Sequence, residues 1–244
     1  MPRKLFGLIG GVTAAAASAD EALLRQIAQQ RDSDPLIGAK IGGREITQQL
    51  FTKMNSERGF HIESMLCALG ALAGHACQAS IRARNVARGV PEMTDLVAVD
   101  TPDDRRYFFG DAINHPLSEA QYSIRKPVAG QAQQSACGQL PDVGEIFRHA
   151  AETVGSEAFG QLRVPPQHLP HDQPNNYLRT LWPELLPRIR RFCPEPGHWP
   201  VLLGFSIQEV IDQGKSVLDP CLAARLVMES AIPAAKENLP YLAT

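Results

Sequence analysis

The chain has 244 residues, of which 44% are hydrophobic and 20% are charged, a composition typical of a globular protein with a sizeable core. Lys and Arg number 24 against 26 Asp and Glu, so the formal net charge is -2. This balance excludes the strongly basic surface that nucleic acids and anionic membranes select. We therefore expect one globular domain over residues 1–244 and no nucleic-acid partner.

The N-terminal residues support two interpretations. Arg3 and Lys4 precede an apolar stretch, and the small residues 17–19 resemble the cleavage site of a secretory signal peptide. Against export, glycines interrupt that stretch, and residues 18–21 spell a capping box for a helix reaching about residue 31. The five cysteines contain no C-x-x-C pair, which favours buried, reduced thiols. We expect a soluble, cytoplasmic protein, with export through a signal peptide ending near Ala19 as the alternative.

The next segment predicts two short helical elements. Asp34 and Pro35 suit the start of a short turn of helix, and the segment "REITQQLFTKMN" follows it. In the latter, Ile46, Leu50 and Met54 fall on one face of an amphipathic helix. Beyond the N-terminus no apolar run approaches the roughly 20 residues that cross a bilayer, so we expect no membrane span.

The stretch "GFHIESMLCALGALAGHACQAS" predicts a long helix from about residue 59 to residue 88. Cys67, Gly70, Gly74 and Cys77 share one face of it, because positions three and four apart are neighbours on a helix. Glycine inside a helix costs about 1 kcal/mol relative to alanine, and close approach of another helix compensates for that cost. These four residues predict a helix-packing seam, within the protein or between the two copies of a homodimer.

The hydrophobic period then changes to that of strands. Residues 96–99 and 106–109 are β-rich and flank "TPDD", which predicts a β-hairpin near residues 95–109. The other periodic segments are helical. The predicted fold is therefore mainly α, at the margin of α+β: a multi-helix globular bundle with one β-hairpin.

Turn and cap signals organise the second half of the chain. Pro127 is expected to break or kink the helix after the hairpin, while Asp142 and Asp219 suit the caps of two later helices. The proline-rich residues 161–176 predict an ordered loop, which is the best place for a boundary between subdomains.

Two polar groupings resemble metal sites incompletely. The tripeptide from His61 to Glu63 matches half of the zinc deaminase signature, but Ala224 replaces a required cysteine of the other half. His168, His171 and Asp172 are metal-ligand residue types, yet such groupings are common in loops that hold no metal. We predict no metal and no cofactor.

A third grouping, Asp111, Asn114 and His115, directly follows the hairpin. Polar groups clustered by one helical turn at the end of a strand can line a pocket. Helix capping alone explains Asp111 and Asn114 but leaves His115 without a role. The grouping therefore marks a candidate pocket with His115 as an acid or base.

Two functions from different classes follow from these patterns. The lack of an intact catalytic signature favours a soluble, bacterial-type helical interaction or scaffold protein without catalytic activity. Its partner would be a second copy of itself, as a homodimer, or another protein. The alternative is a small-molecule enzyme or binding protein with a pocket near Asp111, Asn114 and His115, and the sequence does not decide between the two.

Overall fold

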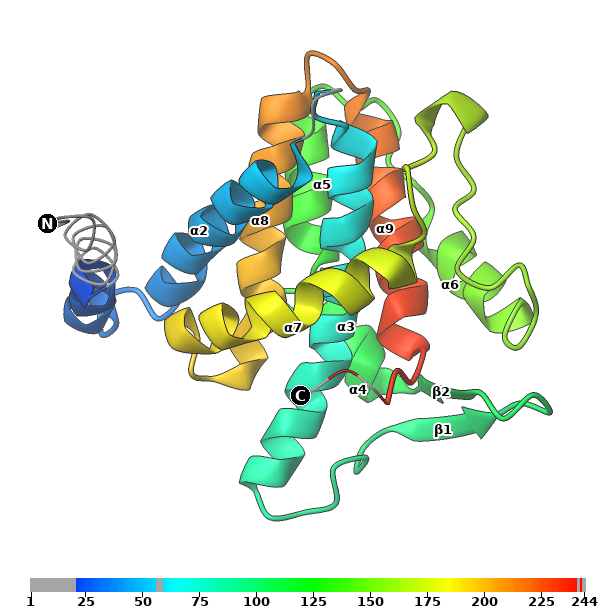
Figure 1. The fold of residues 1–244 in the computed structure, drawn as a ribbon, viewed down its shortest axis with the longest axis horizontal. Coiled ribbons are helices and arrows are strands. Elements are labelled where there is room, and N and C mark those ends of the chain that lie inside the picture. The colour runs from blue at the N-terminus through cyan, green and yellow to red at the C-terminus, as the bar shows by residue number, and fades with distance from the viewer. Residues whose placement is uncertain (1–20, 56–58, 241, 243–244) are drawn as a thin grey trace, which may run out of the picture.

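A central helix, α3, organises the fold of the computed structural model, which describes residues 21–55, 59–240 and 242 (Figure 1). The described residues are mostly helical and contain a single two-stranded sheet, so the mainly α prediction is confirmed. After a helical segment at residues 21–30, the elements are α2 (Ile37–Met54), α3 (Ile62–Ala87), β1 (Val97–Asp100), β2 (Arg106–Phe109), α4 (Asp111–Asn114), α5 (Arg125–Gln134), α6 (Val143–Glu152), α7 (Pro174–Phe192), α8 (Trp199–Gly214) and α9 (Pro220–Lys236).

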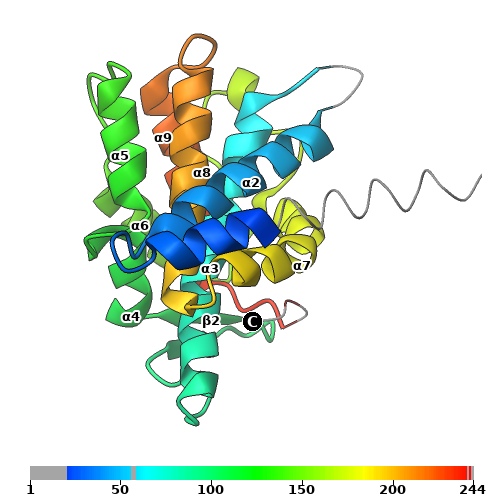
Figure 2. The same cartoon turned by 90° about the vertical axis from the view of Figure 1, so that its left-hand side faces the viewer.

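α3 is covered by other helices along nearly its whole length. It packs against α7, α8 and α9, with α5 beside α8 and α9 and with α2 across α8 (Figure 2). By length and hydropathy α3 could cross a membrane, so the expectation that no apolar run reaches this length is wrong. The apolar window is entirely buried inside the protein, and a helix surrounded by other helices needs apolar residues all round.

A close helix contact joins α3 to α9. A Cβ atom added to Gly74 would lie 2.0 Å from the carbonyl oxygen of Ala231, and one at Gly70 would lie 2.6 Å from that of Val227. Both glycines therefore face the backbone of α9 without room for a side chain. The structure places the predicted seam inside one chain, between α3 and α9.

Two helix boundaries differ from the sequence-based predictions. α2 is one continuous helix that takes in most of both predicted elements, and its Gly42 and Gly43 lie close to α8: Cβ atoms there would lie 2.5 Å and 2.9 Å from atoms of Leu202. Pro127 does not break a helix either. It lies in the first turn of α5, where the missing N–H of proline removes no helical hydrogen bond.

The hairpin is confirmed and lies at one end of the bundle (Figure 1). β1 and β2 are antiparallel, with Val99 opposite Tyr107. The other side of Tyr107 makes a β-bridge to Glu237, just after α9, which ties β2 to the helical body. All four residues of β1 are exposed, and no described strand pairs with its outer edge.

The cysteines differ from the expectation that all five are reduced. Cys137 and Cys221, which are 84 positions apart, form a disulfide that joins the segment after α5 to the first turn of α9. Cys67, Cys77 and Cys193 are free and buried, and burial raises the pKa of Cys67 to about 12. The disulfide could not be predicted because only the tertiary fold brings its two cysteines together.

The proline-rich loop between α6 and α7 lies against the helical body. Buried residues on both sides of the loop belong to one hydrophobic cluster. The candidate signal-peptide cleavage site near Ala19 lies outside the described residues.

Candidate functional site

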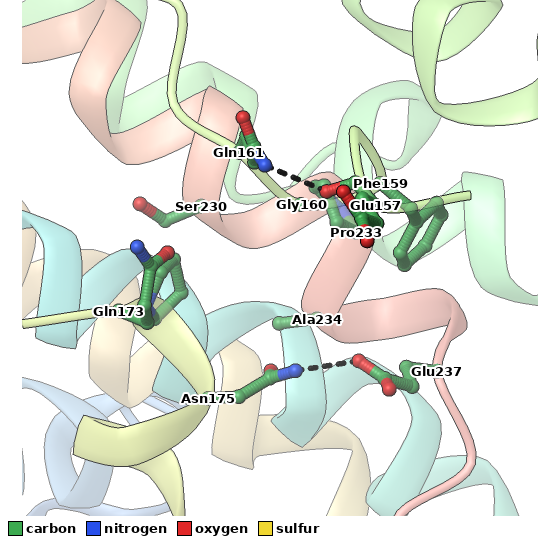
Figure 3. A pocket seen from close by; sticks show the side chains of 11 residues that line it. Glu157, Phe159, Gly160, Gln161, Gln173, Asn175, Ser230, Pro233, Ala234 and Glu237 are labelled. Atoms are coloured by element: carbon green, nitrogen blue, oxygen red, sulfur yellow. Dashed lines mark hydrogen bonds between the residues drawn. The ribbon is translucent and has the colours of Figure 1, made fainter. Parts of the chain in front are cut away.

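A pocket of about 230 Å³ lies between the start of α7, the last turns of α9 and the segment at residues 157–161 (Figure 3). Its walls combine amides, two carboxylates, one hydroxyl and an apolar patch, and contain no basic side chain. The lining residues are Glu157, Phe159, Gly160, Gln161, Gln173, Pro174, Asn175, Ser230, Pro233, Ala234 and Glu237.

The polar side chains of the pocket are only partly used by contacts within the protein. Asn175 Nδ2 donates to Glu237 Oε2 at 2.6 Å, and Gln161 Nε2 donates to the carbonyl oxygen of Glu157 at 2.7 Å (Figure 3). The Gln173 side chain has no hydrogen bond to a described residue. The pocket therefore presents spare donors and spare acceptors next to each other.

The apolar part of the pocket comes from Phe159 and the end of α9. The Phe159 ring makes an edge contact with Tyr107, at 4.8 Å between ring centroids, which helps to fix its position. Gly160, with φ of +76°, turns the chain sharply between Phe159 and Gln161, a conformation that favours glycine. A partly apolar wall beside convergent polar groups is the usual composition of a small-molecule site.

Beside the pocket, four residues tie the following loop to the start of α3; we call His61, Glu63, His168 and His171 the histidine cluster. His168 Nδ1 lies 2.9 Å from Glu63 Oε1, and His61 Nε2 lies 3.3 Å from Glu63 Oε2. The rings of His61 and His171 stack with centroids 3.9 Å apart. The backbone N–H of His171 donates to Ser64 Oγ at 2.9 Å, so side chains and backbone both hold the loop.

His61 also caps α3. Its Nδ1 accepts the backbone N–H of Ser64 at 3.3 Å and lies 2.8 Å from Ser64 Oγ. Burial lowers the pKa of His61, and the nearby imidazoles of His171 and His168 lower it further, while Glu63 opposes this shift. For Glu63, burial raises the pKa, but the hydrogen bond from His168, a backbone hydrogen bond and the attraction of His61 and His168 together outweigh burial, and the net pKa is lowered. The cluster thus favours a neutral His61 beside an ionised Glu63.

Within the described part of the chain, no three His, Cys, Asp or Glu side chains are grouped so that they could hold a metal ion. The structure nevertheless joins the two groupings that the sequence offered separately, residues 61–63 and residues 168–172. Glu63 and His168 are 105 positions apart, and neither local pattern contained a signal that they would meet.

The predicted pocket residues after the hairpin have different environments. Asp111 and His115 are exposed, and His115 Nδ1 is 3.8 Å from Glu119. Asn114 turns inward, where its Oδ1 accepts a hydrogen bond from Lys236 Nζ at 3.1 Å. None of the three lines the pocket in Figure 3.

Lys236, the partner of Asn114, was missed by the sequence analysis. It is only 2% exposed, and its ammonium lies 4.6 Å from the centroid of Phe109 and 5.3 Å from that of Phe147. Burial lowers the pKa of Lys236 to about 8. This amine is enclosed and tied to Asn114, so we assign it to packing between α9, β2 and α6.

Comparison with other proteins adds no assignment: no protein-family model matches the chain, and no curated protein or solved structure matches it either.

Proposed function

We propose that the protein is a non-catalytic binding protein for a small, neutral, hydroxyl-rich molecule, held in the pocket between α7, α9 and residues 157–161. The pocket lining carries this proposal: the amides of Gln161, Gln173 and Asn175 offer donors and acceptors, beside two carboxylates and without a basic side chain. Hydroxyl groups both donate and accept, so they complement such walls. An anionic ligand would instead face Glu157 and Glu237 without a counter-charge.

The chemistry of the lining also supports binding without catalysis. The eleven lining residues include no histidine, cysteine or lysine; of the other groups, Glu157 is exposed, Glu237 accepts a hydrogen bond from Asn175, and the Ser230 hydroxyl donates to the carbonyl oxygen of Leu226. The histidine cluster is committed to capping α3 and holding the loop, and Ser64 Oγ already contacts both His61 and His171. The cluster thus holds parts of the protein together, whereas a catalytic group would face the substrate.

The proposal is tested by thermal unfolding with three sets of compounds: neutral polyols and monosaccharides, small organic anions, and small organic amines. A ligand present at ten times its Kd stabilises the native state by about 1.4 kcal/mol, which raises the Tm of a chain of this size by roughly 3–6 °C. We expect the neutral hydroxyl compounds alone to raise the Tm. No shift with any set, or a shift with anions, would contradict the proposal.

Gln173→Ala and Gln167→Ala form a matched pair for locating the site. The Gln173 amide makes no hydrogen bond to a described residue, so its removal should affect binding without unfolding the protein. One neutral hydrogen bond contributes about 1 kcal/mol, so we expect Gln173→Ala to weaken binding roughly fivefold in calorimetry. Gln167 is exposed in the same loop but does not line the pocket, so Gln167→Ala should bind like the wild type.

A second candidate is the interaction role, for which β1 supplies a specific observation. Val97 and Val99 are 58% and 39% exposed on a strand whose outer edge is not paired by any described strand. Open strand edges of this kind can add a strand from a partner, including a second copy. Light scattering tests the homodimer: a dimer that Val99→Lys converts into a folded monomer would support it, and a monomeric wild type would exclude it.

The disulfide supports the export alternative over a cytoplasmic location. Disulfides persist in oxidising compartments and are rare in the cytosol. Thiol titration of the purified chain, denatured without reductant, should find the three thiols of Cys67, Cys77 and Cys193, whereas a fully reduced chain would give five. For the exported protein, mass analysis should find a mature chain that begins near residue 20.

A further inference from the structure

We propose that the histidine cluster is a proton-operated latch: acid releases residues 166–173 of the loop from α3 and loosens the wall of the pocket that Gln173 forms. The latch concerns the loop itself and is independent of which ligand, if any, the pocket binds. Gln161 and Gln173 at the two ends of the loop line the pocket, while His168 and His171 between them contact the start of α3.

The hydrogen bonds of His61 require a neutral ring with one particular tautomer. Nδ1 must be free of hydrogen, because it accepts the backbone N–H of Ser64. We assign the ring hydrogen to Nε2, which faces Glu63 Oε2 at 3.3 Å. Both ring nitrogens are then satisfied, the cap of α3 is made, and the uncharged ring can stack on His171.

Protonation of His61 breaks this arrangement at two points. The new hydrogen on Nδ1 is donated to Ser64 Oγ, 2.8 Å away, so Nδ1 no longer accepts the backbone N–H of Ser64 and the helix loses its cap. The imidazole of His171, stacked at 3.9 Å, opposes a positive charge on His61. Both effects separate the loop from α3.

The other titratable groups around His61 set the strength of the response. Glu63 attracts a protonated His61 and also holds His168, which makes it the main opposing charge. Asp172 and the hydroxyl of Tyr177, which hydrogen-bonds to Ser64, flank the cluster from the loop and from α7. Cys67 lies near Tyr177, and its buried thiol stays protonated throughout the acid range.

The loop has a second anchor that does not depend on histidine. Arg163 pairs with Glu145 of α6 and lies 2.9 Å from the buried carboxylate of Glu229 on α9. These ion pairs should hold the first part of the loop at mildly acidic pH. Release is therefore expected at residues 166–173, and the fold as a whole should persist.

Hydrogen exchange of the ligand-free protein at pH 7 and pH 5 tests the latch, with protection factors that correct for the intrinsic effect of pH. When opening of the loop is coupled to the uptake of one proton, its equilibrium constant rises by up to about tenfold per pH unit below the pKa. We expect about a tenfold loss of protection at residues 166–173 in the wild type. His61→Asn should abolish this loss, because asparagine caps a helix at either pH. His115→Asn, at an exposed histidine on another element, should respond like the wild type.

Unchanged protection of the loop in the wild type between pH 7 and pH 5 would overturn the proposal. An equal loss of protection in His61→Asn would also overturn it, because release would then not require His61. Should His61→Asn fold poorly, His171→Leu gives a second test: it removes the charge that repels His61, so its acid response should be smaller than that of the wild type. Failure of all compounds to bind the pocket would leave this result unaffected.

Discussion

The middle of α3 and the first turn of α3 make contacts of opposite kinds. In the middle, Gly70 and Gly74 lie directly against backbone atoms of Val227 and Ala231 on α9. At the first turn, His61 and Glu63 meet a loop through imidazole and carboxylate groups that are partly exposed. The first contact depends only on shape, whereas the second depends on the protonation state.

This difference assigns separate tasks to the two regions. Close-packed interiors have few voids and tolerate little change in volume, so the α3–α9 contact fixes the frame of the molecule. Loops held by polar contacts open at lower free-energy cost than core helices. A wall of the proposed binding pocket is therefore attached to the rigid frame through a contact that can respond to conditions.

The largest expected effect comes from adding one methyl group to the seam. A Cβ at Gly74 would lie 2.0 Å from a carbonyl oxygen of α9, so the two helices must separate. We expect Gly74→Ala to lower the free energy of unfolding by about 3 kcal/mol, which corresponds to a Tm lower by roughly 6–12 °C. Urea and thermal unfolding followed by circular dichroism measure both quantities.

Gly130→Ala is the matched control for that substitution. Gly130 also lies inside a helix, α5, but a Cβ there would meet nothing within 4 Å. Alanine is the better helix former, so this variant should be more stable than the wild type by about 0.5–1 kcal/mol. A Gly74→Ala variant that is stabilised to the same degree would refute the close contact between α3 and α9.

A smaller effect is expected from His75, a polar residue within the middle of α3. The side chain is fully buried, neither ring nitrogen has a hydrogen-bond partner among the described residues, and the ring makes an edge contact with Trp182. Burial, with a smaller contribution from Arg82, lowers the pKa of His75 to about 3. Between pH 6.5 and about 3 the unfolded chain therefore binds a proton that the folded chain does not.

The sign of this linkage means that His75 destabilises the fold in acid. At pH 4.5, two pH units below the ordinary histidine pKa, this linkage lowers the free energy of unfolding by about 2–3 kcal/mol. His75→Leu should remove this cost, so that its stability advantage over the wild type grows between pH 7 and pH 4.5. Urea unfolding at the two pH values measures the difference, and a constant difference would show that His75 is not buried in the neutral form.

The sequence predicted those features that depend on neighbouring residues. The hairpin followed from two β-rich runs around a turn, and Asp142 and Asp219 cap α6 and α9 through hydrogen bonds of 3.1 Å and 2.9 Å. The spacing of Gly70 and Gly74 indicated a close helix contact, because the cost of glycine in a helix calls for compensation. Local chemistry was sufficient in each of these cases.

The candidate site depends on contacts between distant segments, and the sequence did not reveal it. Glu63 meets His168, Asn175 meets Glu237, and Cys137 meets Cys221, each across more than sixty positions. The continuity of α2 was missed for a related reason, because the packing of Gly42 and Gly43 against α8 is a tertiary contact that the local sequence does not show. Only the packed structure distinguishes these cases.

Hydrogen exchange along the whole described chain, in the His75→Leu variant at pH 7 and at pH 5, tests most directly whether the two regions of α3 behave differently, because this background lacks the acid destabilisation assigned to His75. We predict that the amides of α3 and α9 around Gly74 and Ala231 keep their protection at pH 5, while residues 166–173 lose about tenfold. Loss of protection in both regions together would mean that acid unfolds the protein globally. That result, or a loop protected equally at both pH values, would contradict the account.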